Sequence, residues 1–191
     1  MSSNAEMDAR IARLEDRHAI EELVVLYGFY VDERDVDGLS EIFCRDAALI
    51  SEDGTYAAEG LENILQTYRQ RFTTLGPSYH YTHGHVVRFD PNDPDAATGL
   101  VAAHAEVQSN ETAMQVGLRY KDAYRRVEGS WRFLKRTLSF MYYMPFSEMA
   151  SDLGDRNAVR MAGDQKPSDW PEALYASDGN AFLKEFHRTS A

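Results

Sequence analysis

The apolar residues of this chain change their spacing at Gly76-Pro77, and that change constrains the fold more than any other feature. Before it, apolar residues recur every three or four positions, which is the period of an amphipathic helix. After it, apolar and polar residues alternate, which is the period of a half-buried strand. The predicted helices are Ala5–Tyr30, Asp37–Cys44 and Glu62–Phe72, and the predicted strands are Tyr79–Phe89, Thr98–Ser109, Met114–Val127 and Ser130–Tyr143.

The residues between these runs predict how the elements connect. Asp37 is expected to cap the second helix, and an extended segment over residues 47–51 leads to a turn at Asp53-Gly54. The strands are separated by turn residues at Asp90–Asp95, Asn110-Glu111 and Glu128-Gly129, so each strand is expected to pair antiparallel with the next. Helices followed by a strand meander predict an α+β fold.

Composition excludes several classes of protein. A chain of 191 residues can bury one core, so a single domain is expected. No apolar run reaches the roughly 18 residues of a membrane span, and the first residues lack a secretory signal, so we expect a cytoplasmic protein with no membrane partner. The net charge of −11 disfavours nucleic acid as a partner. The single cysteine, Cys44, lies at the end of a predicted helix and is expected to be a buried core residue.

The C-terminal part of the chain differs from the rest. Prolines and glycines divide residues 146–191 into short pieces around Trp170, Leu174, Phe182 and Phe186. We therefore expect a domain over residues 1–145 and a tail over 146–191. The tail is expected to pack on the domain or on a neighbouring subunit; a disordered tail is the alternative.

Three segments carry a resemblance to a known family. AIEELVVLYGFYVDERDVDGLSEIFCRDAALI resembles the opening of SnoaL-like domains, in which a helix ends at an aspartate. YHYTHGHVVRF resembles the first long strand of that family, with its pocket histidine, and GLRYKDAYRRVEGSWRFLKRT resembles its last hairpin. The chain is thereby similar to the SnoaL-like and nuclear transport factor 2-like family over residues 18–145. The resemblance implies a cone in which N-terminal helices pack on a curved, mostly antiparallel sheet around a pocket.

Within that family the motifs resemble those of the cofactor-independent lyases, such as scytalone dehydratase, bile acid 7α-dehydratase and hexachlorocyclohexane dehydrochlorinase. The aspartate and the catalytic histidine of the last two have the same spacing as Asp32 and His80. The resemblance also implies that Arg136 and Tyr27 belong to the pocket. The chain departs from the dehydrochlorinase pattern, because Tyr27 stands where that enzyme has a lysine. It departs from the bile acid enzyme as well, because Ala103 stands where that enzyme has a second acid.

The residue types of this pair suit proton abstraction. Histidine has an ordinary pKa of about 6.5, so His80 is the candidate base. Asp32 would accept a hydrogen bond from one ring nitrogen, set the tautomer and stabilise the imidazolium. Arg136 could stabilise a developing oxyanion or form an ion pair with one of the many acids. Tyr27 could bind the leaving group or serve as a core tyrosine. The alternative for His80 is a hydrogen-bonded polar residue in a pocket without chemistry.

Strand alternation also bears on the other histidines. It places His80 on one face and His83 and His85 on the other, where they would be surface or subunit-contact residues. This arrangement supplies no third convergent ligand, so no metal is expected. His104 is expected to point outward as well. The chain has no phosphate loop and no dinucleotide fingerprint, so no cofactor is expected.

The predicted pocket is aromatic. The residues expected to contact a substrate are Tyr30, Ala103, Tyr120, Leu138, Phe140 and Tyr142. An apolar pocket with few polar groups favours a hydrophobic aromatic, polycyclic or steroid-like small molecule.

The first functional hypothesis is a cofactor-independent lyase of the dehydratase type, in which His80 and Asp32 remove a proton. A retro-aldol lyase that releases formaldehyde, an isomerase or a cyclase could use the same base. A non-catalytic binding module, such as the small subunit of a ring-hydroxylating dioxygenase, is the alternative from another class. The resemblance further implies a homo-oligomer, either a dimer or a trimer.

Overall fold

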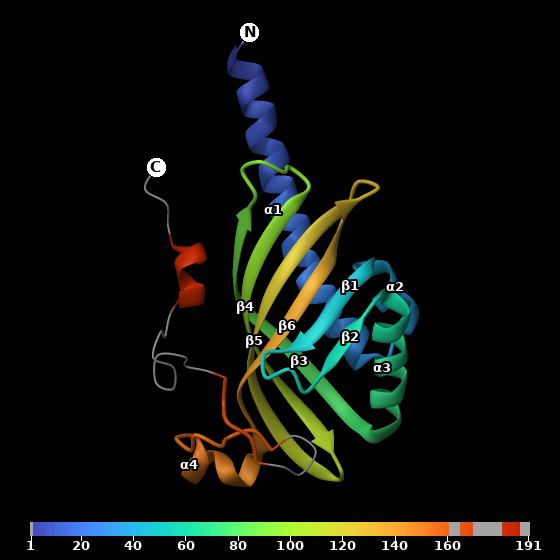
Figure 1. Ribbon diagram of the computed structural model, residues 1–191, viewed down its shortest axis with the longest axis vertical. Helices are drawn as coiled ribbons and strands as arrows, with labels where there is room; N and C mark the ends of the chain where they lie inside the picture. The colour runs from blue at the N-terminus through green and yellow to red at the C-terminus, as the bar shows by residue number, and fades with distance from the viewer. Residues whose placement is uncertain (1, 161–164, 170–180, 188–191) are drawn as a thin grey trace.

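A curved six-stranded sheet forms the body of the protein, with helices packed against it (Figure 1). The computed structural model describes residues 2–160, 165–169 and 181–187. The helices of the body are α1 (Ser2–Asp32), α2 (Val36–Ile42) and α3 (Leu61–Thr74). The strands are β1 (Phe43–Ser51), β2 (Ala57–Glu59), β3 (Leu75–Phe89), β4 (Ala96–Ser109), β5 (Thr112–Val127) and β6 (Ser130–Pro145).

The strand order is β2-β1-β6-β5-β4-β3, and every neighbouring pair is antiparallel except β1 and β6. The predicted α+β class, the helices and the meander of long strands are therefore confirmed. The parallel pairing of β1 with β6 and the short strand β2 were not predicted. A parallel partner that lies far along the chain leaves no local turn signal in the sequence.

Two local predictions around α2 are wrong. The N-cap is Asp35 and not Asp37, because the carboxylate of Asp35 accepts the backbone N–H of Gly38 at 2.8 Å. Cys44 is buried as expected, but it lies in β1 and not at a helix end. Both differences arise because α2 begins and ends one or two residues earlier than the apolar stripe suggests.

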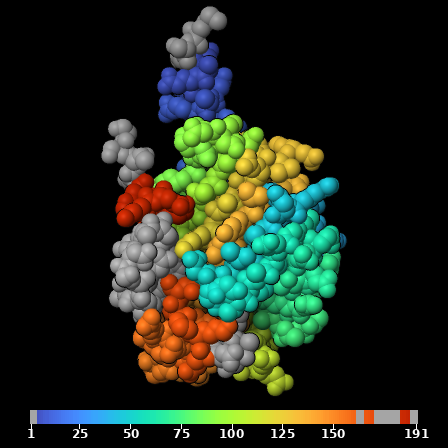
Figure 2. All heavy atoms as spheres, viewed as in Figure 1, coloured from blue at the N-terminus to red at the C-terminus, as the bar shows by residue number. Residues whose placement is uncertain are grey.

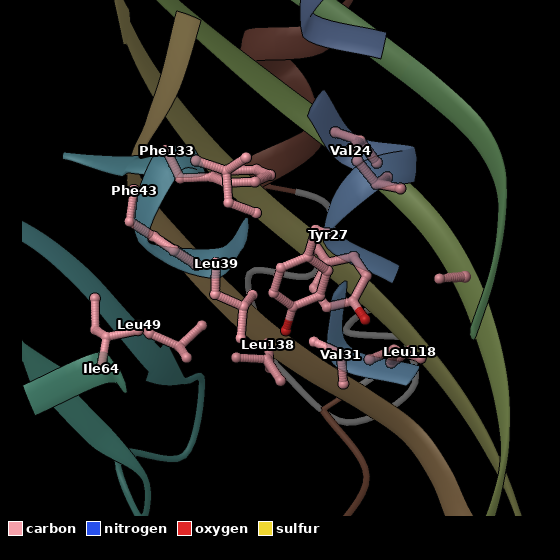
Figure 3. Packing of buried hydrophobic residues seen from close by; sticks show 14 of the residues in the cluster. Val24, Tyr27, Val31, Leu39, Phe43, Leu49, Ile64, Leu118, Phe133 and Leu138 are labelled. Atoms are coloured by element: carbon pink, nitrogen blue, oxygen red, sulfur yellow. The ribbon is translucent and has the colours of Figure 1, made fainter. Parts of the chain in front are cut away.

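Helix α1 divides into a free part and a packed part. Its first turns project beyond the sheet (Figures 1 and 2), and Met7, Ile11 and Leu14 are exposed there. Its second part packs against β3 and β6. Val24, Tyr27 and Val31 point from that part into the core, opposite side chains of β1 and β6 (Figure 3).

Among the register shifts of β3 and β6, two decide which side chains face the candidate site. In β3 the pairing with β4 shifts between Thr82 and His85, and one extra residue is accommodated there. In β6 the pairing with β5 shifts between Phe140 and Tyr142. An extra residue reverses the inward and outward alternation beyond it, so both bulges change which side chains face the core.

The core contains a fully buried ion pair. The guanidinium of Arg136 donates from Nε and Nη2 to the two carboxylate oxygens of Asp122, at 2.9 and 2.7 Å. The rings of Tyr27, Tyr120 and Phe133 lie 4.1 to 4.2 Å from the guanidinium carbon. The cation is thus paired with one acid and enclosed by aromatic faces, which compensates for its removal from water.

The described part of the C-terminal segment follows β6. It contains η1 (Phe146–Glu148), α4 (Met149–Asp152) and η3 (Ala181–Phe186). Val159 pairs with Tyr143, and Asp169 exchanges two hydrogen bonds with the backbone of Phe140, at 2.8 and 2.9 Å. The predicted packing of Trp170, Leu174 and the Phe182 side chain lies outside the described residues. None of the helices in the described ranges combines the length and the hydropathy needed to cross a bilayer.

The Arg136–Asp122 pair predicts an unequal effect of two otherwise similar substitutions. Arg136→Met leaves a buried carboxylate without its cation and should lower the free energy of unfolding by about 3–5 kcal/mol. Arg125→Met removes the partly exposed pair with Asp93 (2.7 Å) and should cost about 0–1 kcal/mol. Urea unfolding at pH 7 measures both values. Equal losses in the two variants would contradict the buried pair.

Candidate active site

Asp32 and His80 form the centre of the candidate site. One carboxylate oxygen of Asp32 accepts the backbone N–H of His80 at 2.7 Å, and the other lies 2.6 Å from His80 Nδ1. Since a carboxylate oxygen accepts hydrogen bonds, Nδ1 is the donor in this contact, and Nε2 is the ring nitrogen left for a substrate. The side chains are 10% exposed for His80 and 15% for Asp32. Most of the surface of the pair is therefore shielded from bulk water, and a small part of it is still exposed.

The local chain path brings the two residues together. Helix α1 ends at Asp32 because the chain reverses at Arg34, which has a left-handed backbone with φ of 62°. The Arg34 guanidinium then donates to the carbonyls of Leu75 and Gly76, at 3.1 and 2.5 Å, and to the hydroxyl of Ser78, at 3.2 Å. These contacts tie the end of α1 to the start of β3, which places Asp32 opposite the His80 backbone.

His80 lines a small cavity between α1, α3 and the sheet. Its volume is about 20 Å³, which is room for one water molecule. The polar lining residues are Tyr27, Tyr68, Arg71, His80, Tyr120 and Tyr143. The apolar lining comes mainly from Val31, Ala105, Val116, Leu118, Leu138 and Phe140. Any ligand larger than water must displace side chains to enter.

Two tyrosines in the cavity form a hydroxyl pair. The hydroxyl oxygens of Tyr27 and Tyr68 lie 2.6 Å apart, and both residues are buried. Burial raises the pKa of Tyr68 well above its usual value, so this hydroxyl keeps its proton at neutral pH. One proton lies between the two oxygens, and the second remains available to a ligand. The pair is a hydrogen-bond donor on the wall of the cavity that His80 also lines.

Arg136 does not line this cavity. It lies behind Tyr27 and Tyr120, whose rings separate it from the space next to His80. Its contact with Asp122 is the ion pair that the sequence left open as an alternative. Arg136 therefore acts on the cavity through the two tyrosine rings that it supports.

Three of the predicted contact residues also lie elsewhere. Tyr30 lines a groove of about 680 Å³ between α1, α2 and the β5–β6 turn, whose charged residues are four acids and one arginine. Tyr142 is turned outward by the bulge in β6, and its ring covers Gly117, so Tyr143 takes its place in the cavity. Ala103 is buried in the core but does not line the cavity, unlike Ala105 two residues later. Tyr120, Leu138 and Phe140 do line it.

The bulge in β3 likewise overturns the prediction for His85. It returns His85 to the inner face, where Nε2 lies 3.1 Å from the Tyr124 hydroxyl. That hydroxyl donates to Asp122 at 2.9 Å, so Nε2 is the donor and Nδ1 is left buried without a partner in the described structure. Burial lowers the pKa of His85 to about 4, although the charge of Asp122 opposes the shift. The ring is neutral at physiological pH.

His83 and His104 lie on the outer face, as predicted. His83 Nε2 lies 2.6 Å from His104 Nδ1, and the two rings stack at a centroid distance of 4.8 Å. Tyr81 stacks on the other side of His104. Within the described residues, no three or more His, Cys, Asp and Glu side chains are grouped closely enough to hold a metal ion.

Sequence reasoning missed Arg34, Tyr68, Arg71 and Tyr143. Tyr68 and Arg71 are three residues apart on α3, so they share a face of the helix, and this spacing is a signal that the sequence does contain. Tyr143 and Arg34 have no such signal, because a bulge and a chain reversal determine their positions.

The chain was compared with known proteins. A sequence model of the SnoaL-like domain matches residues 12–137. No match was found among curated proteins. Among solved structures, hexachlorocyclohexane dehydrochlorinase LinA type 3 from Novosphingobium barchaimii is similar, with 23% identity, a TM-score of 0.65 and coverage of 72% of this chain and 94% of that chain.

Two structures from Novosphingobium aromaticivorans are also similar. A proposed scytalone dehydratase has 18% identity and a TM-score of 0.65, with coverage of 70% of this chain and 89% of that chain. A proposed aromatic ring hydroxylase has 25% identity and a TM-score of 0.64, with coverage of 72% of this chain and 98% of that chain. Together the solved structures share the cone fold of this chain.

The neutral state of His85 predicts a pH dependence of stability. Its pKa is about 4 in the folded protein and about 6.5 when unfolded, so its contribution is present above pH 6.5 and is lost as the pH falls through 4. When the pH is lowered from 7 to 4, the free energy of unfolding of the wild type should therefore fall by on the order of 2 kcal/mol more than that of His85→Gln.

Denaturant unfolding across this pH range measures the effect. Val87→Ala is the matched control, because Val87 is buried on the same strand and carries no titratable group. Its cost should be the same at every pH. A His85→Gln difference that stays equally constant would show that His85 is not buried in its neutral form.

Proposed function

This chain belongs to the SnoaL-like family, and we propose that it is a cofactor-independent lyase that eliminates a small group from a hydrophobic substrate. One observation carries the proposal. The Asp32 carboxylate holds both the backbone N–H and the Nδ1 of His80, which leaves Nε2 as the basic nitrogen beside an apolar cavity. This is the arrangement that a general base needs.

His80 Nε2 abstracts a proton from a carbon next to the leaving group. The imidazolium that forms is stabilised by the negative charge of Asp32, which it contacts at 2.6 Å. A histidine base of this kind typically contributes about 10²–10⁴-fold to the rate. The apolar walls strengthen the interaction, because a charge pair is screened less in a cavity that excludes water.

The tyrosine pair can donate a proton to the leaving group. As Tyr27 and Tyr68 share one proton between their oxygens, the second hydroxyl proton can be donated to a departing hydroxyl or halide, or can hydrogen-bond a carbonyl oxygen of the substrate. The high pKa of Tyr68 suits a donor that stays protonated until the bond breaks. Arg136 supports the ring of Tyr27 from the opposite side, at 4.2 Å.

The cavity walls indicate the class of substrate. Aromatic and branched apolar side chains line most of the cavity, which favours a flat hydrophobic molecule over a sugar or a nucleotide. Among the similar structures, one is named for its action on hexachlorocyclohexane, and another is named as a proposed scytalone dehydratase. The homo-oligomeric assembly and the cytoplasmic location expected from the sequence stay predictions.

A kinetic comparison of histidines tests the proposal. The purified protein is incubated with a panel of hexachlorocyclohexane and aryl and steroid β-hydroxy ketones, and the products are identified by mass spectrometry. His80→Ala and Asp32→Asn should each lower the turnover of an accepted compound at least about 100-fold. His83→Ala, on the outer face of the same strand, should leave it unchanged.

The products distinguish elimination from the other reactions of the same base. Elimination yields an alkene together with water or halide, retro-aldol cleavage yields an aldehyde, and isomerisation releases nothing. Melting temperatures of the variants within a few degrees of wild type would show that the loss is catalytic. Full turnover by His80→Ala would exclude His80 as the base.

A further inference from the structure

The mouth of the cavity carries a cation as well as a base. Arg71 and His80 are the lining residues that are not buried, whereas the other residues around the cavity are. Solvent therefore reaches the cavity past these two side chains. Any substrate that His80 deprotonates must come close to Arg71.

The Arg71 guanidinium has no acidic partner in the described part of the chain. The ion pairs found there use Lys121, Arg125, Arg126, Arg136 and Arg160. Arg71 instead lines the cavity together with tyrosines, among them Tyr68 and Tyr143. A guanidinium stays protonated at any physiological pH, so the cavity mouth carries a positive charge that is not paired with a carboxylate of the described residues.

Arg71 is in the last turn of α3, but stabilisation of that helix end does not explain where its side chain lies. A basic side chain in the last turn of a helix can interact with the unpaired carbonyls there. Here the Arg71 carbonyl already accepts the backbone N–H of Leu75 and the hydroxyl of Thr74. The Arg71 side chain lines the cavity beside the base.

We infer that Arg71 binds a carboxylate of the substrate, so that the substrate class is an aromatic carboxylic acid. This inference rests on the proposed function, and it names the substrate class of the same site. A planar guanidinium matches a carboxylate through two parallel hydrogen bonds. A phosphate suits the site less well, because Arg71 is at the negative C-terminal end of α3 and the cavity offers one cation for a doubly charged group.

The carboxylate would determine the orientation of the ligand. With the anion at Arg71, on the solvent side, the apolar body of the substrate extends inward between Tyr120, Leu138 and Phe140. A cavity of about 20 Å³ must expand to admit it. Arg71 is the mouth residue that can move, because His80 is held at two points by Asp32.

Equilibrium binding of two matched probes tests the inference without any turnover. Trans-cinnamate and cinnamamide have the same size and shape but differ in charge. Isothermal titration calorimetry at pH 7.5 should show that the wild type binds cinnamate about 10- to 100-fold more tightly than the amide. Arg71→Met should abolish this preference, whereas Arg71→Lys should keep part of it.

Arg69→Met is the matched control. Arg69 is on the same helix, two residues away, and is exposed, so its removal changes the net charge equally without touching the cavity. It should leave the preference for cinnamate intact. Arg71→Gln replaces Arg71→Met if the latter does not fold. Equal binding of the two probes by wild type, binding of neither, or an equal loss in the Arg69 variant would each overturn the inference.

The test separates this inference from the proposed function. If the chain is not a lyase, no elimination occurs, yet the preference for cinnamate still depends on Arg71 and persists in His80→Ala. If the lyase proposal holds and the inference fails, neutral substrates are turned over and Arg71→Met does not change their kcat/KM.

Discussion

The buried guanidinium of Arg136 organises the interior of the cone. A cation removed from water must be compensated, and here Asp122 supplies the charge while Tyr27, Tyr120 and Phe133 supply aromatic faces. Asp122 in turn accepts a hydrogen bond from Tyr124, whose oxygen is contacted by His85. One buried charge thus determines the orientation of side chains from α1, β3, β5 and β6.

The candidate site is built on the other side of the same rings. Tyr27 has one face on Arg136 and also lines the cavity that contains His80, and its hydroxyl contacts Tyr68 of α3. Rigid support of this kind is what a site needs to hold its donor near the base. A second anchor, Arg34, ties the end of α1 to β3 and so sets the distance between Asp32 and His80. The two arginines act as positioning residues, whereas Arg71 lines the cavity itself.

The bulges explain why strand alternation predicted some faces and not others. Alternation held over β4 and over the first part of β3, so the placements of His80, His83 and His104 followed from the sequence. Beyond the extra residue in each bulged strand the alternation reverses, which moved His85 inward and exchanged Tyr142 for Tyr143. In β3 a glycine, Gly84, lies at the shift beside His85, and Gly76-Pro77 lies at an earlier shift of the same strand. The shift in β6 between Phe140 and Tyr142 contains neither glycine nor proline, so only the pairing shows it.

The sequence by itself determined the class of fold, the order of helices and strands, and the pairing of Asp32 with His80 as a hypothesis. These follow from periodicity and from a resemblance that depends on residue spacing along the chain. Only the tertiary structure decided that Arg136 lies behind the cavity, that His85 points inward, and that Arg71 and Tyr68 of α3 line the same cavity as the base. The physical reason is that burial, bulges and unpaired charge depend on contacts between distant segments, which no local pattern records.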